Sequence, residues 1–512
     1  MSDFKVPLII RGEVIEDYEV QHHDRSLGRS FLTPNVAKYA DRMVAKSAAA
    51  LNDLYTISID EICEYLGELG RRLDLDRNPH WREAFEVSCY ASNMSRSVLE
   101  AVYRNTPAAF ESARVREVAE VRIGIPFLEG WVRTQLADGR AIDVRAMGSR
   151  SAHVIAGNVP FTAAGTMIRC ALTRNDAIVK APSNDPLTMV AIARTMIDMA
   201  PNHPITRHLT VAYWKGGDET IESRIYQPQH IEKLVAWGGQ ASIRHIVKYI
   251  QPGIDLITMD PKISMTMIGR EALADEAAMR TVAMRAAADL GAWDQEACVN
   301  ARVIYLESGT DAQGLELANR FGRYLFEAVQ QLPKTTSAGC ARFNPELKEE
   351  VQALLQNDTF YKVFTGPERL EKTGAVIVSQ MSEQVDFPSL LYGRVGNLVP
   401  VDNIEEALRV LSSATQTVGI YPDDLRLRLR DRVAIMGSQR LIPLGYAMRG
   451  TMAGPHDGME LERRMCRWVM DMHADPRVIP GPWVHEGEMT SLPSAPEMNS
   501  GRAKSTTVEG AQ

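Results

Sequence analysis

Cysteine pairs, a secretion signal and long apolar runs are all missing from this sequence, and each absence excludes a class of protein. The six cysteines are widely spaced, with no CxxC pair, which argues against a structural zinc site. So few cysteines in 512 residues also argue against a disulfide framework, and reduced thiols in a cytoplasmic protein fit best. The start, MSDFKVPLII, lacks the basic and apolar regions of a secretion signal. No apolar run of about 18 residues occurs, so no membrane-spanning helix is expected.

An excess of positive charge is also missing. The formal net charge is −8, which argues against nucleic acid as the main partner but leaves room for a local basic pocket that holds a phosphate. The length of 512 residues predicts two or three domains, at roughly 100–200 residues per domain.

The chain changes texture along its length. Residues 36–120 carry apolar residues at helical spacing, and Ser58 with Glu61 forms a Ser-x-x-Glu helix start. From about residue 150, strand-like and helix-like segments alternate, which indicates a parallel sheet with helices on its faces. Such sheets bind ligands at the carboxyl ends of their strands. A second α/β stretch begins near residue 270.

Two smaller features complete the expected domain plan. Asp138-Gly139 between two alternating segments predicts a hairpin, and the Ser-, Pro- and Gly-rich end predicts a disordered tail. We therefore expect a helical part with a first α/β domain, a hairpin, a second α/β domain with the catalytic cysteine, a C-terminal segment and a tail. Their bounds are 1–129 with 151–268, 130–150, 269–440, 441–485 and 486–512.

The segment around Cys298 is the most informative for chemistry. It places a thiol between the end of a predicted helix and a predicted strand, where backbone N–H groups could stabilise a thiolate and later an oxyanion. The alternative is that Cys298 is one more small buried apolar residue, and the local sequence alone favours that alternative.

A family resemblance changes this balance. DQEACVNARVIYL resembles the nucleophile segment of the aldehyde dehydrogenase superfamily, which contains Gly-Gln-x-Cys, three residues and Arg-Val. Cys298 and Arg302-Val303 match this segment and Gln295 lies close before them, whereas Glu296 departs from the residue often found there. The resemblance implies that Cys298 is the nucleophile.

A second segment, VIAGNVPFTAAGTMIRCAL, resembles the strand, asparagine and helix of the same superfamily. The resemblance implies that the Asn158 amide and the backbone N–H of the nucleophile form the oxyanion hole. The alternative is that Asn158 merely caps the following helix, a role that asparagine performs well.

The cofactor segments are similar to those of the superfamily as well. AIVKAPSNDPLT resembles Lys-Pro-Ser-Glu-x-x-Pro, with Lys180 and Pro186 in register, and the resemblance implies that Lys180 binds the adenosine ribose. Ser183 stands where a glutamate usually disfavours a 2′-phosphate, so NADPH is the expected cofactor. Gly238 and Gly239, before a predicted helix, resemble the turn beneath the cofactor pyrophosphate. The GxGxxG fingerprint is absent, as it is in this superfamily.

Two departures bear on the reaction. Hydrolytic members carry a glutamate that activates water, and with Lys262 in register Thr258 occupies its place. A threonine hydroxyl is a poor general base at neutral pH, although Asp260 could take that role. In residues 392–397 the glutamate that contacts the nicotinamide ribose is also missing. The first departure favours reduction of an acyl enzyme over its hydrolysis.

The closest resemblance is to the bacterial luminescence acyl-CoA reductases, over roughly residues 120–475, including GPHDGMELERRMCRWV. It implies an aldehyde-dehydrogenase-like α/β fold with two doubly wound domains and an oligomerisation hairpin. It also implies NADPH-dependent reduction of an acyl-CoA or acyl-carrier-protein thioester to an aldehyde. We expect a homo-oligomer, with acyl-transferring or acyl-activating enzymes as partners. His456 either binds substrate or orders a turn, and a basic amphipathic helix is expected after it.

Three rival functions stay open at this point. The first is a hydrolytic NAD(P)-dependent aldehyde dehydrogenase, which Thr258 disfavours. The second is a non-catalytic, acyl-holding scaffold subunit of a multienzyme reductase, which the missing glutamate in residues 392–397 allows. The third is a cysteine acyltransferase, which the cofactor-type segments disfavour.

Overall fold

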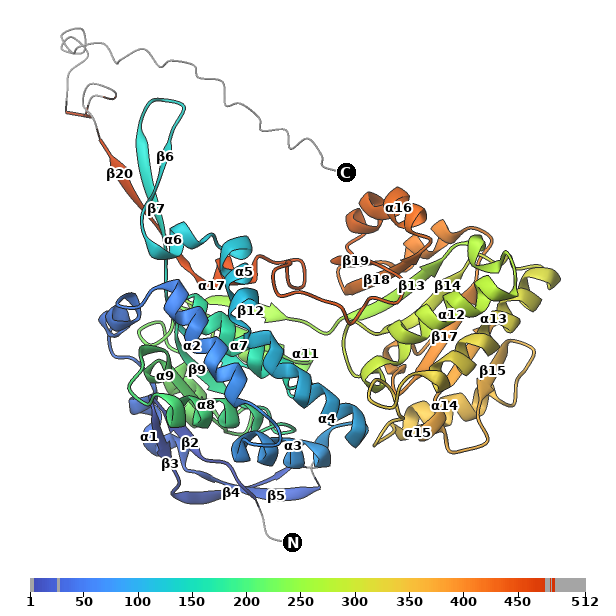
Figure 1. The fold of residues 1–512 in the computed structure, drawn as a ribbon, viewed down its shortest axis with the longest axis horizontal. Helices are drawn as coiled ribbons and strands as arrows, with labels where there is room; N and C mark the ends of the chain where they lie inside the picture. Colours follow the sequence, from blue (N-terminus) through green and yellow to red (C-terminus); the bar gives the residue numbers. More distant parts are fainter. Residues whose placement is uncertain (1–3, 25–27, 475–478, 480, 484–512) are drawn as a thin grey trace.

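The computed structural model describes residues 4–24, 28–474, 479 and 481–483, and these form two lobes with a slender sheet that projects from the first (Figure 1). Each lobe contains a seven-stranded sheet. Strands β12 (Asp255–Met259) and β13 (Ile263–Ile268) carry the chain from the first sheet to the second. The predicted tail at 486–512 lies outside the described residues.

The first sheet has the order β12-β11-β8-β9-β10-β2-β3. Its first five strands are parallel, and β2, from the start of the chain, pairs antiparallel with β10. Because β8, β9 and β10 are buried along their whole length, both sheet faces are covered, as a parallel sheet requires. The strands are β2 (Leu8–Ile10), β3 (Glu13–Ile15), β8 (Arg150–Val154), β9 (Asp176–Lys180), β10 (Leu209–Ala212) and β11 (Lys233–Trp237). The helices between them are α7 (Phe161–Leu172), α8 (Thr188–Met199), α9 (Pro204–Arg207), α10 (Glu219–Ile225) and α11 (Gln240–Val247).

The N-terminal region is helical over the span that the periodicity predicts. Ser58 and Glu61 form the expected capping box, in which the Glu61 side chain accepts from the Ser58 N–H at 2.6 Å and the Ser58 hydroxyl accepts from the Glu61 N–H at 3.1 Å. Trp81 is fully buried and shares one apolar core with the first sheet and α7. The helices are α1 (Val36–Met43), α2 (Ile59–Arg72), α3 (Pro79–Ala91), α4 (Arg96–Asn105), α5 (Ser112–Arg122) and α6 (Ile125–Glu129), with 3₁₀ turns at Ala48–Tyr55 and Thr106–Phe110. A small sheet of β1 (Phe4–Lys5), β5 (Arg29–Pro34) and β4 (Tyr18–Asp24) precedes them.

The second sheet has the order β15-β16-β17-β14-β13-β18-β19 and is parallel except at β15. It begins at Ile263 with β13, six residues before the boundary expected at 269. Its other strands are β14 (Ala301–Leu306), β15 (Tyr361–Thr365), β16 (Ala375–Ser379), β17 (Val395–Pro400), β18 (Thr415–Tyr421) and β19 (Arg440–Pro443). Its helices are α12 (Glu276–Gly291), α13 (Ala312–Gln331), α14 (Pro345–Leu354), α15 (Leu370–Thr373) and α16 (Asp423–Ile435), with 3₁₀ turns at Arg270–Leu273, Ala292–Gln295, Pro388–Leu390 and Ile404–Val410.

The projecting sheet contains the hairpin that Asp138-Gly139 predicts. Strands β6 (Val132–Gln135) and β7 (Ala141–Met147) flank the turn, where Gly139 has a φ of 85°. A third strand, β20 (Arg467–His473), pairs antiparallel with β7 over its whole length. The amphipathic helix expected after His456 is therefore wrong in extent, because α17 spans only Leu461–Met465 and the chain then becomes extended to pair with β7.

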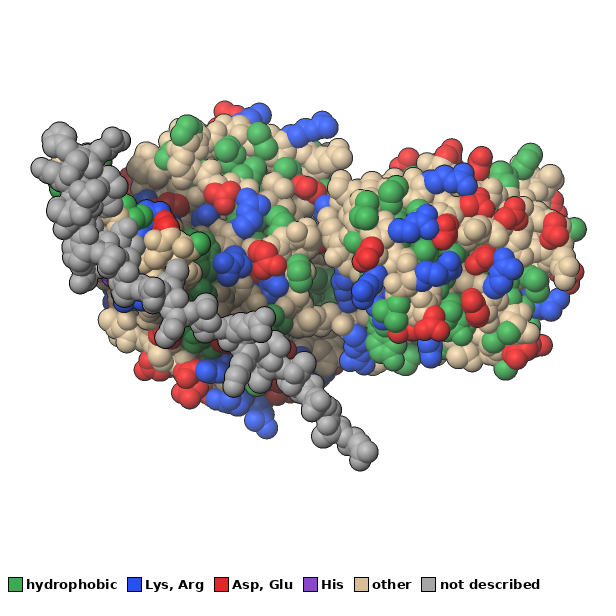
Figure 2. Space-filling view, turned by 90° about the horizontal axis from the view of Figure 1, so that it is seen from above, with side chains coloured by type: hydrophobic (Ala, Val, Ile, Leu, Met, Phe, Trp, Pro, Cys, Tyr) green, Lys and Arg blue, Asp and Glu red, His purple; other side chains and the backbone are tan. Residues whose placement is uncertain are grey.

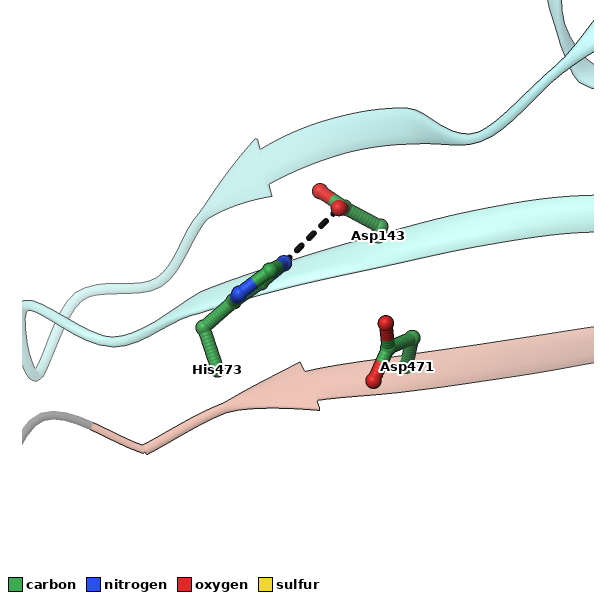
Figure 3. A group of neighbouring side chains, drawn as sticks. All are labelled: Asp143, Asp471 and His473. Atoms are coloured by element: carbon green, nitrogen blue, oxygen red, sulfur yellow. Dashed lines mark hydrogen bonds and ion pairs between the residues drawn. The ribbon is translucent and has the colours of Figure 1, made fainter.

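A group of polar side chains links two strands of this sheet, as Figure 3 shows for Asp143, Asp471 and His473. His473 Nε2 lies 2.7 Å from Asp143 Oδ2, and Arg133 Nε donates to Asp143 Oδ1 at 2.9 Å. These bonds, with Arg133 first, lower the pKa of Asp143 to about 2. Because a guanidinium already neutralises Asp143, we interpret the group as ion pairing between β7 and β20.

Charged side chains of both signs are mixed on the visible surface (Figure 2). On the face seen in Figure 2, acidic and basic side chains are interspersed over both lobes. Among the described residues, no helix is both long and apolar enough to cross a membrane.

Candidate active site

Cys298 lies on a short loop between α12 and β14, at the amino end of that strand. All six cysteines are within the described residues and are free thiols, and Cys298 is the one that is exposed. Just before it, Trp293, Asp294 and Gln295 have positive φ angles of 54°, 51° and 68°. Residues other than glycine rarely adopt this left-handed conformation, and it persists only where the surroundings hold it in place.

Asp294 supplies much of that support, from a fully buried position. Its Oδ2 accepts the backbone N–H and the hydroxyl of Ser95 in the first lobe, both at 2.8 Å. Its Oδ1 accepts the backbone N–H groups of Ala338 and Gly339, at 2.7 and 3.0 Å. The turn that leads to the thiol is therefore fixed by groups from both lobes.

Two further side chains fix the backbone on either side of the thiol. Gln295 pairs with Val395 on β17 in both directions, because its Nε2 donates to the carbonyl oxygen at 3.0 Å and its Oε1 accepts the N–H at 2.9 Å. Ser264 on β13 donates its hydroxyl to the Cys298 carbonyl oxygen at 2.7 Å and accepts the Thr417 N–H at 3.1 Å. The loop is thus tied to three strands of the second sheet.

Asn158 meets the same loop from the first lobe. Its Nδ2 donates to the carbonyl oxygen of Glu296, two residues before Cys298, at 3.4 Å. Helix α7 begins after Pro160 and has no side-chain cap, so the helix-capping alternative for Asn158 is not realised. The amide instead faces the loop that carries the thiol.

The surroundings of Cys298 favour the protonated thiol over the thiolate. Crowding by protein atoms raises the pKa of this thiol, although solvent reaches the side chain. A hydrogen bond from the Gln416 side chain opposes the rise, and the charge of Asp457 adds to it. Arg302 and Arg440 are near enough for the Cys298 charge to act on their own pKa values. Attack by this sulfur therefore needs a group that accepts its proton.

Glu296 is a site residue to which sequence reasoning gave no role. Burial raises the pKa of its carboxyl to about 7, against a smaller lowering by a hydrogen bond from Asn93. Its Oε1 is buried and has no partner among the described residues. The only sequence signal was its departure from the small residue of the family segment. The carboxyl changes charge near neutral pH, two residues from Cys298.

His456 orders a turn, which is one of the two roles that the sequence left open. Its N–H and carbonyl oxygen bond with those of Met459, at 3.0 and 2.9 Å, and Asp457 and Gly458 between them have φ angles of 48° and 72°. Two consecutive positive φ angles define a type I′ turn, which suits Asp-Gly. The ring stands edge-on to Trp237, with centroids 5.1 Å apart. Burial lowers the pKa of His456 to about 3, so its imidazole is neutral at pH 7.

Lys180 ends strand β9 and is buried, as its neighbours in the strand are. Its Nζ lies 5.7 Å from the ring centroids of both Tyr213 and Trp214, which directly follow β10. Burial lowers the pKa of Lys180 to about 8, and the more distant charge of Glu222 opposes this. A cation that faces aromatic rings is suited to hydroxyl or phosphate oxygens. Ser183 lies three residues further on, half-buried in the loop before α8.

Gly238 and Gly239 lie between β11 and α11, at the same carboxyl edge of the first sheet. Gly239 is the N-cap residue of α11 and no side chain caps the helix, so its first N–H groups remain available to an anion. A Cβ on Gly238 would lie 3.1 Å from Ser242 Cβ, whereas one on Gly239 would meet nothing within 4 Å. The space beside Gly239 is therefore open, as a pyrophosphate at this end of the helix would require.

Thr258 lies near the carboxyl end of β12, where it pairs with Ala236 of β11, two residues before Gly238. Thr258 is half-buried in β12, and Lys262 donates to the carbonyl oxygen of Ser413 at 3.1 Å. Asp260, between them, is exposed. The structure thus groups Lys180, Ser183, Gly238 and Gly239 at one sheet edge, and Asn158 with the Cys298 loop where the lobes meet.

The acyl-CoA reductase (LuxC) family matches residues 55–468. The chain belongs to this family. The resemblance drawn from the short segments is confirmed, and the match begins well before residue 120. The matched region therefore includes the N-terminal helices α2 to α6.

Curated relatives of this LuxC-family chain are named as thioester reductases. A protein of Photorhabdus luminescens named long-chain acyl-protein thioester reductase is 31% identical over 323 residues, which cover 62% of this chain and 63% of that protein. The chain thus aligns with less than two thirds of that relative. A protein of the same name from Aliivibrio fischeri is 28% identical over 474 residues, which cover 91% of this chain and 92% of that protein.

Solved structures of aldehyde dehydrogenases have the same fold as this chain. Lactaldehyde dehydrogenase from Escherichia coli matches with a TM-score of 0.67 at 14% identity, over 92% of this chain and 100% of that one. An NADP-dependent glyceraldehyde-3-phosphate dehydrogenase from Bacillus halodurans, complexed with NADP, matches with a TM-score of 0.67 at 12% identity, over 92% and 99%. The predicted aldehyde-dehydrogenase-like α/β fold is confirmed.

Proposed function

We propose that this protein reduces an acyl thioester to an aldehyde, with NADPH, through an acyl group carried on Cys298. The observation that carries the proposal is an exposed thiol on a left-handed turn that both lobes anchor, with the Asn158 amide against the same loop. Membership of the acyl-CoA reductase family supports the same chemistry.

In the proposed reaction, Cys298 is the nucleophile and Asn158 stabilises the oxyanion. The Cys298 sulfur attacks the thioester carbonyl carbon, and the Asn158 amide donates to the oxygen as negative charge develops there. The tetrahedral intermediate then expels the donor thiol and leaves an S-acyl cysteine. NADPH, when bound near Lys180, Ser183 and the amino end of α11, supplies the hydride that converts this acyl group to the aldehyde level. Collapse of the resulting hemithioacetal releases the aldehyde and restores Cys298.

Thr258 supports reduction over hydrolysis. A water molecule that attacks the acyl cysteine needs a general base, and the threonine at the superfamily's glutamate position is a poor one at neutral pH. Asp260 is exposed to solvent, where a carboxylate is a weak base. Neither Thr258 nor Asp260 would therefore activate water efficiently, which favours transfer of the acyl group to hydride or to another thiol.

The acyl donor in this proposal is a protein-bound or CoA-bound thioester. The curated relatives are named for acyl-protein thioesters, which supports a protein donor, and the family name supports CoA. Both present the same thioester carbonyl to Cys298. An acyl-transferring or acyl-activating enzyme would supply a protein donor.

Self-association through the projecting sheet is also part of the proposal. Within the part of the chain that the structure describes, its outer strands β6 and β20 each pair on one side only, and Met470 and Met472 on β20 are about half exposed. Unpaired edges and exposed apolar side chains are features that a second copy would cover.

Replacing Ser183 tests the cofactor. Ser183→Glu should lower kcat/KM for NADPH by about 10–100-fold, because a carboxylate at this position repels a 2′-phosphate and binds ribose hydroxyls instead. The kcat/KM for NADH should rise. Ser183→Ala is the matched control and should keep the preference for NADPH, since it adds no charge. Initial rates with both nucleotides measure this, and an unchanged preference in Ser183→Glu would place the ribose elsewhere.

The function itself is tested with the wild-type protein. It is mixed with acyl-CoA or an acylated carrier protein and NADPH, while nicotinamide absorbance and aldehyde are followed. Matched loss of NADPH and gain of aldehyde is expected. Release of free acid with NADP+ and an aldehyde would instead support the hydrolytic alternative. Acylation of Cys298 without NADPH oxidation would support an acyl-holding subunit.

A further inference from the structure

The thiol of Cys298 and the carboxylate of Asp457 are joined through one amide. Gln416, buried at the start of β18, donates from Nε2 to Asp457 Oδ1 at 2.6 Å. Gln416 also lowers the pKa of Cys298, which favours the thiolate, and Ser264 links the next residue, Thr417, to the Cys298 carbonyl oxygen. The Gln416 amide thus contacts the Asp457 carboxylate and lies beside the Cys298 loop, an arrangement in which one water molecule could relay a proton between thiol and carboxylate.

Asp457 is held in this position by backbone geometry. It occupies the first central position of the type I′ turn, on the connection that returns from the second sheet to the first lobe. Burial raises its pKa above the ordinary value for an aspartate, so it holds a proton more readily than a surface carboxylate does. The groups that face it are Gln416, which opposes the rise most, then Lys262 and Arg169, with Asp260 acting in the other direction.

We infer that Asp457 is the proton acceptor and donor for Cys298. This inference rests on the proposed function and adds a catalytic residue to it. As the S–C bond forms, the thiol proton passes through one water to Asp457, so the carboxylate becomes neutral. As the bond to the donor thiol breaks, Asp457 returns that proton to the leaving thiolate. The site therefore holds one negative charge before and after the exchange, and no oxidant or reductant is needed.

Other groups near the thiol are less suited to this role. Glu296 has a pKa of about 7, but its charge acts on Cys340 and is not among the influences on the Cys298 pKa. His456 has a pKa of about 3 and scarcely binds a proton at neutral pH. Thr258 carries an alcohol, which is a poor base. Arg302 and Arg440 are cations that stabilise a thiolate but cannot accept its proton.

Asp457→Asn gives a test in which two reactions of Cys298 move in opposite directions. Asparagine tolerates the left-handed backbone and still accepts from Gln416, so the turn should be retained. Loss of the nearby negative charge should lower the thiol pKa, so alkylation by iodoacetamide at pH 7 should become several-fold faster. Acylation by acyl-CoA without NADPH should become about 10²-fold slower, because the proton acceptor is lost. Mass spectrometry of the Cys298 peptide follows both reactions.

The leaving group gives a second readout that a structural role would not move. An S-phenyl thioester releases a thiolate that needs no proton, so the part of the slowing that comes from the leaving group should disappear, and Asp457→Asn should slow its reaction less than that of acyl-CoA. Glu460→Gln, on the same connection, removes an exposed acid that pairs with Arg122, and it should leave alkylation and acylation unchanged.

The outcomes separate this inference from the proposed function. Equal rates of Cys298 alkylation in wild type and Asp457→Asn would overturn the role of Asp457. So would acylation that becomes faster together with alkylation. Equal slowing of alkylation and of both acyl donors would reduce Asp457 to a support for the loop. Failure of every thioester to acylate the wild type would overturn the proposed function, while the alkylation profiles would still decide whether the Asp457 charge acts on Cys298.

Discussion

Cys298→Ala is expected to lower aldehyde formation by at least about 10³-fold and to abolish acylation of the protein. The reason is that the reaction passes through a covalent bond to this sulfur, and an alanine side chain cannot form it. The thermal midpoint should stay unchanged, because Cys298 is exposed and its truncation leaves no cavity. NADPH-coupled turnover and intact-protein mass after incubation with acyl-CoA measure the two effects.

Cys89→Ala is the matched control. Cys89 is half-buried on α3, and burial raises the pKa of its thiol to about 11. It should therefore remain a thiol that does not react with the donor, and the variant should keep wild-type turnover and labelling. Turnover that survives in Cys298→Ala, or labelling that disappears only in Cys89→Ala, would show that the nucleophile was assigned to the wrong cysteine.

Local pattern was enough to predict most of the fold. The alternation of strand-like and helix-like segments predicted the parallel strands and helices of the first sheet, and Ser58 with Glu61 predicted a helix start. Both signals depend on residues that are close in the sequence. Strand β20 was missed for the opposite reason. Its partner β7 lies more than 300 residues earlier, and the local sequence after Cys466 does not predict a pairing with so distant a strand.

The candidate site divides in the same way. Cys298, Asn158 and Lys180 each sit inside a short segment with its own family resemblance, so one stretch of sequence was enough to select each of them. Asp457 lies within a segment that resembles the family, but that resemblance implied no role for it, and Gln416 was not singled out at all. Their significance appears only when β18 and the returning connection meet beside the Cys298 loop. The aromatic rings that face Lys180 likewise come from the end of the next strand.

The Asn158 amide should matter for the acylation step itself. Asn158→Ala is expected to slow acylation of Cys298 by about 10²–10³-fold, which is the usual effect of removing one oxyanion donor. The thermal midpoint should change little, because the amide makes only a long hydrogen bond of 3.4 Å to the Glu296 carbonyl oxygen. That long bond also leaves the amide free to turn to a substrate oxygen. Single-turnover acylation without NADPH isolates this step from hydride transfer.

Alkylation by iodoacetamide separates the two roles that Asn158 could have. This reaction forms no oxyanion, so iodoacetamide should alkylate Cys298 of Asn158→Ala at nearly the wild-type rate, whereas the acylation rate should fall. Asn105→Ala removes an exposed amide that donates to the Ala101 carbonyl oxygen at 2.7 Å, a side-chain-to-backbone contact at the end of α4, and it should leave the acylation rate unchanged. If alkylation and acylation fall together in Asn158→Ala, the amide acts by holding the Cys298 loop through Glu296, and the oxyanion hole must be built from other donors.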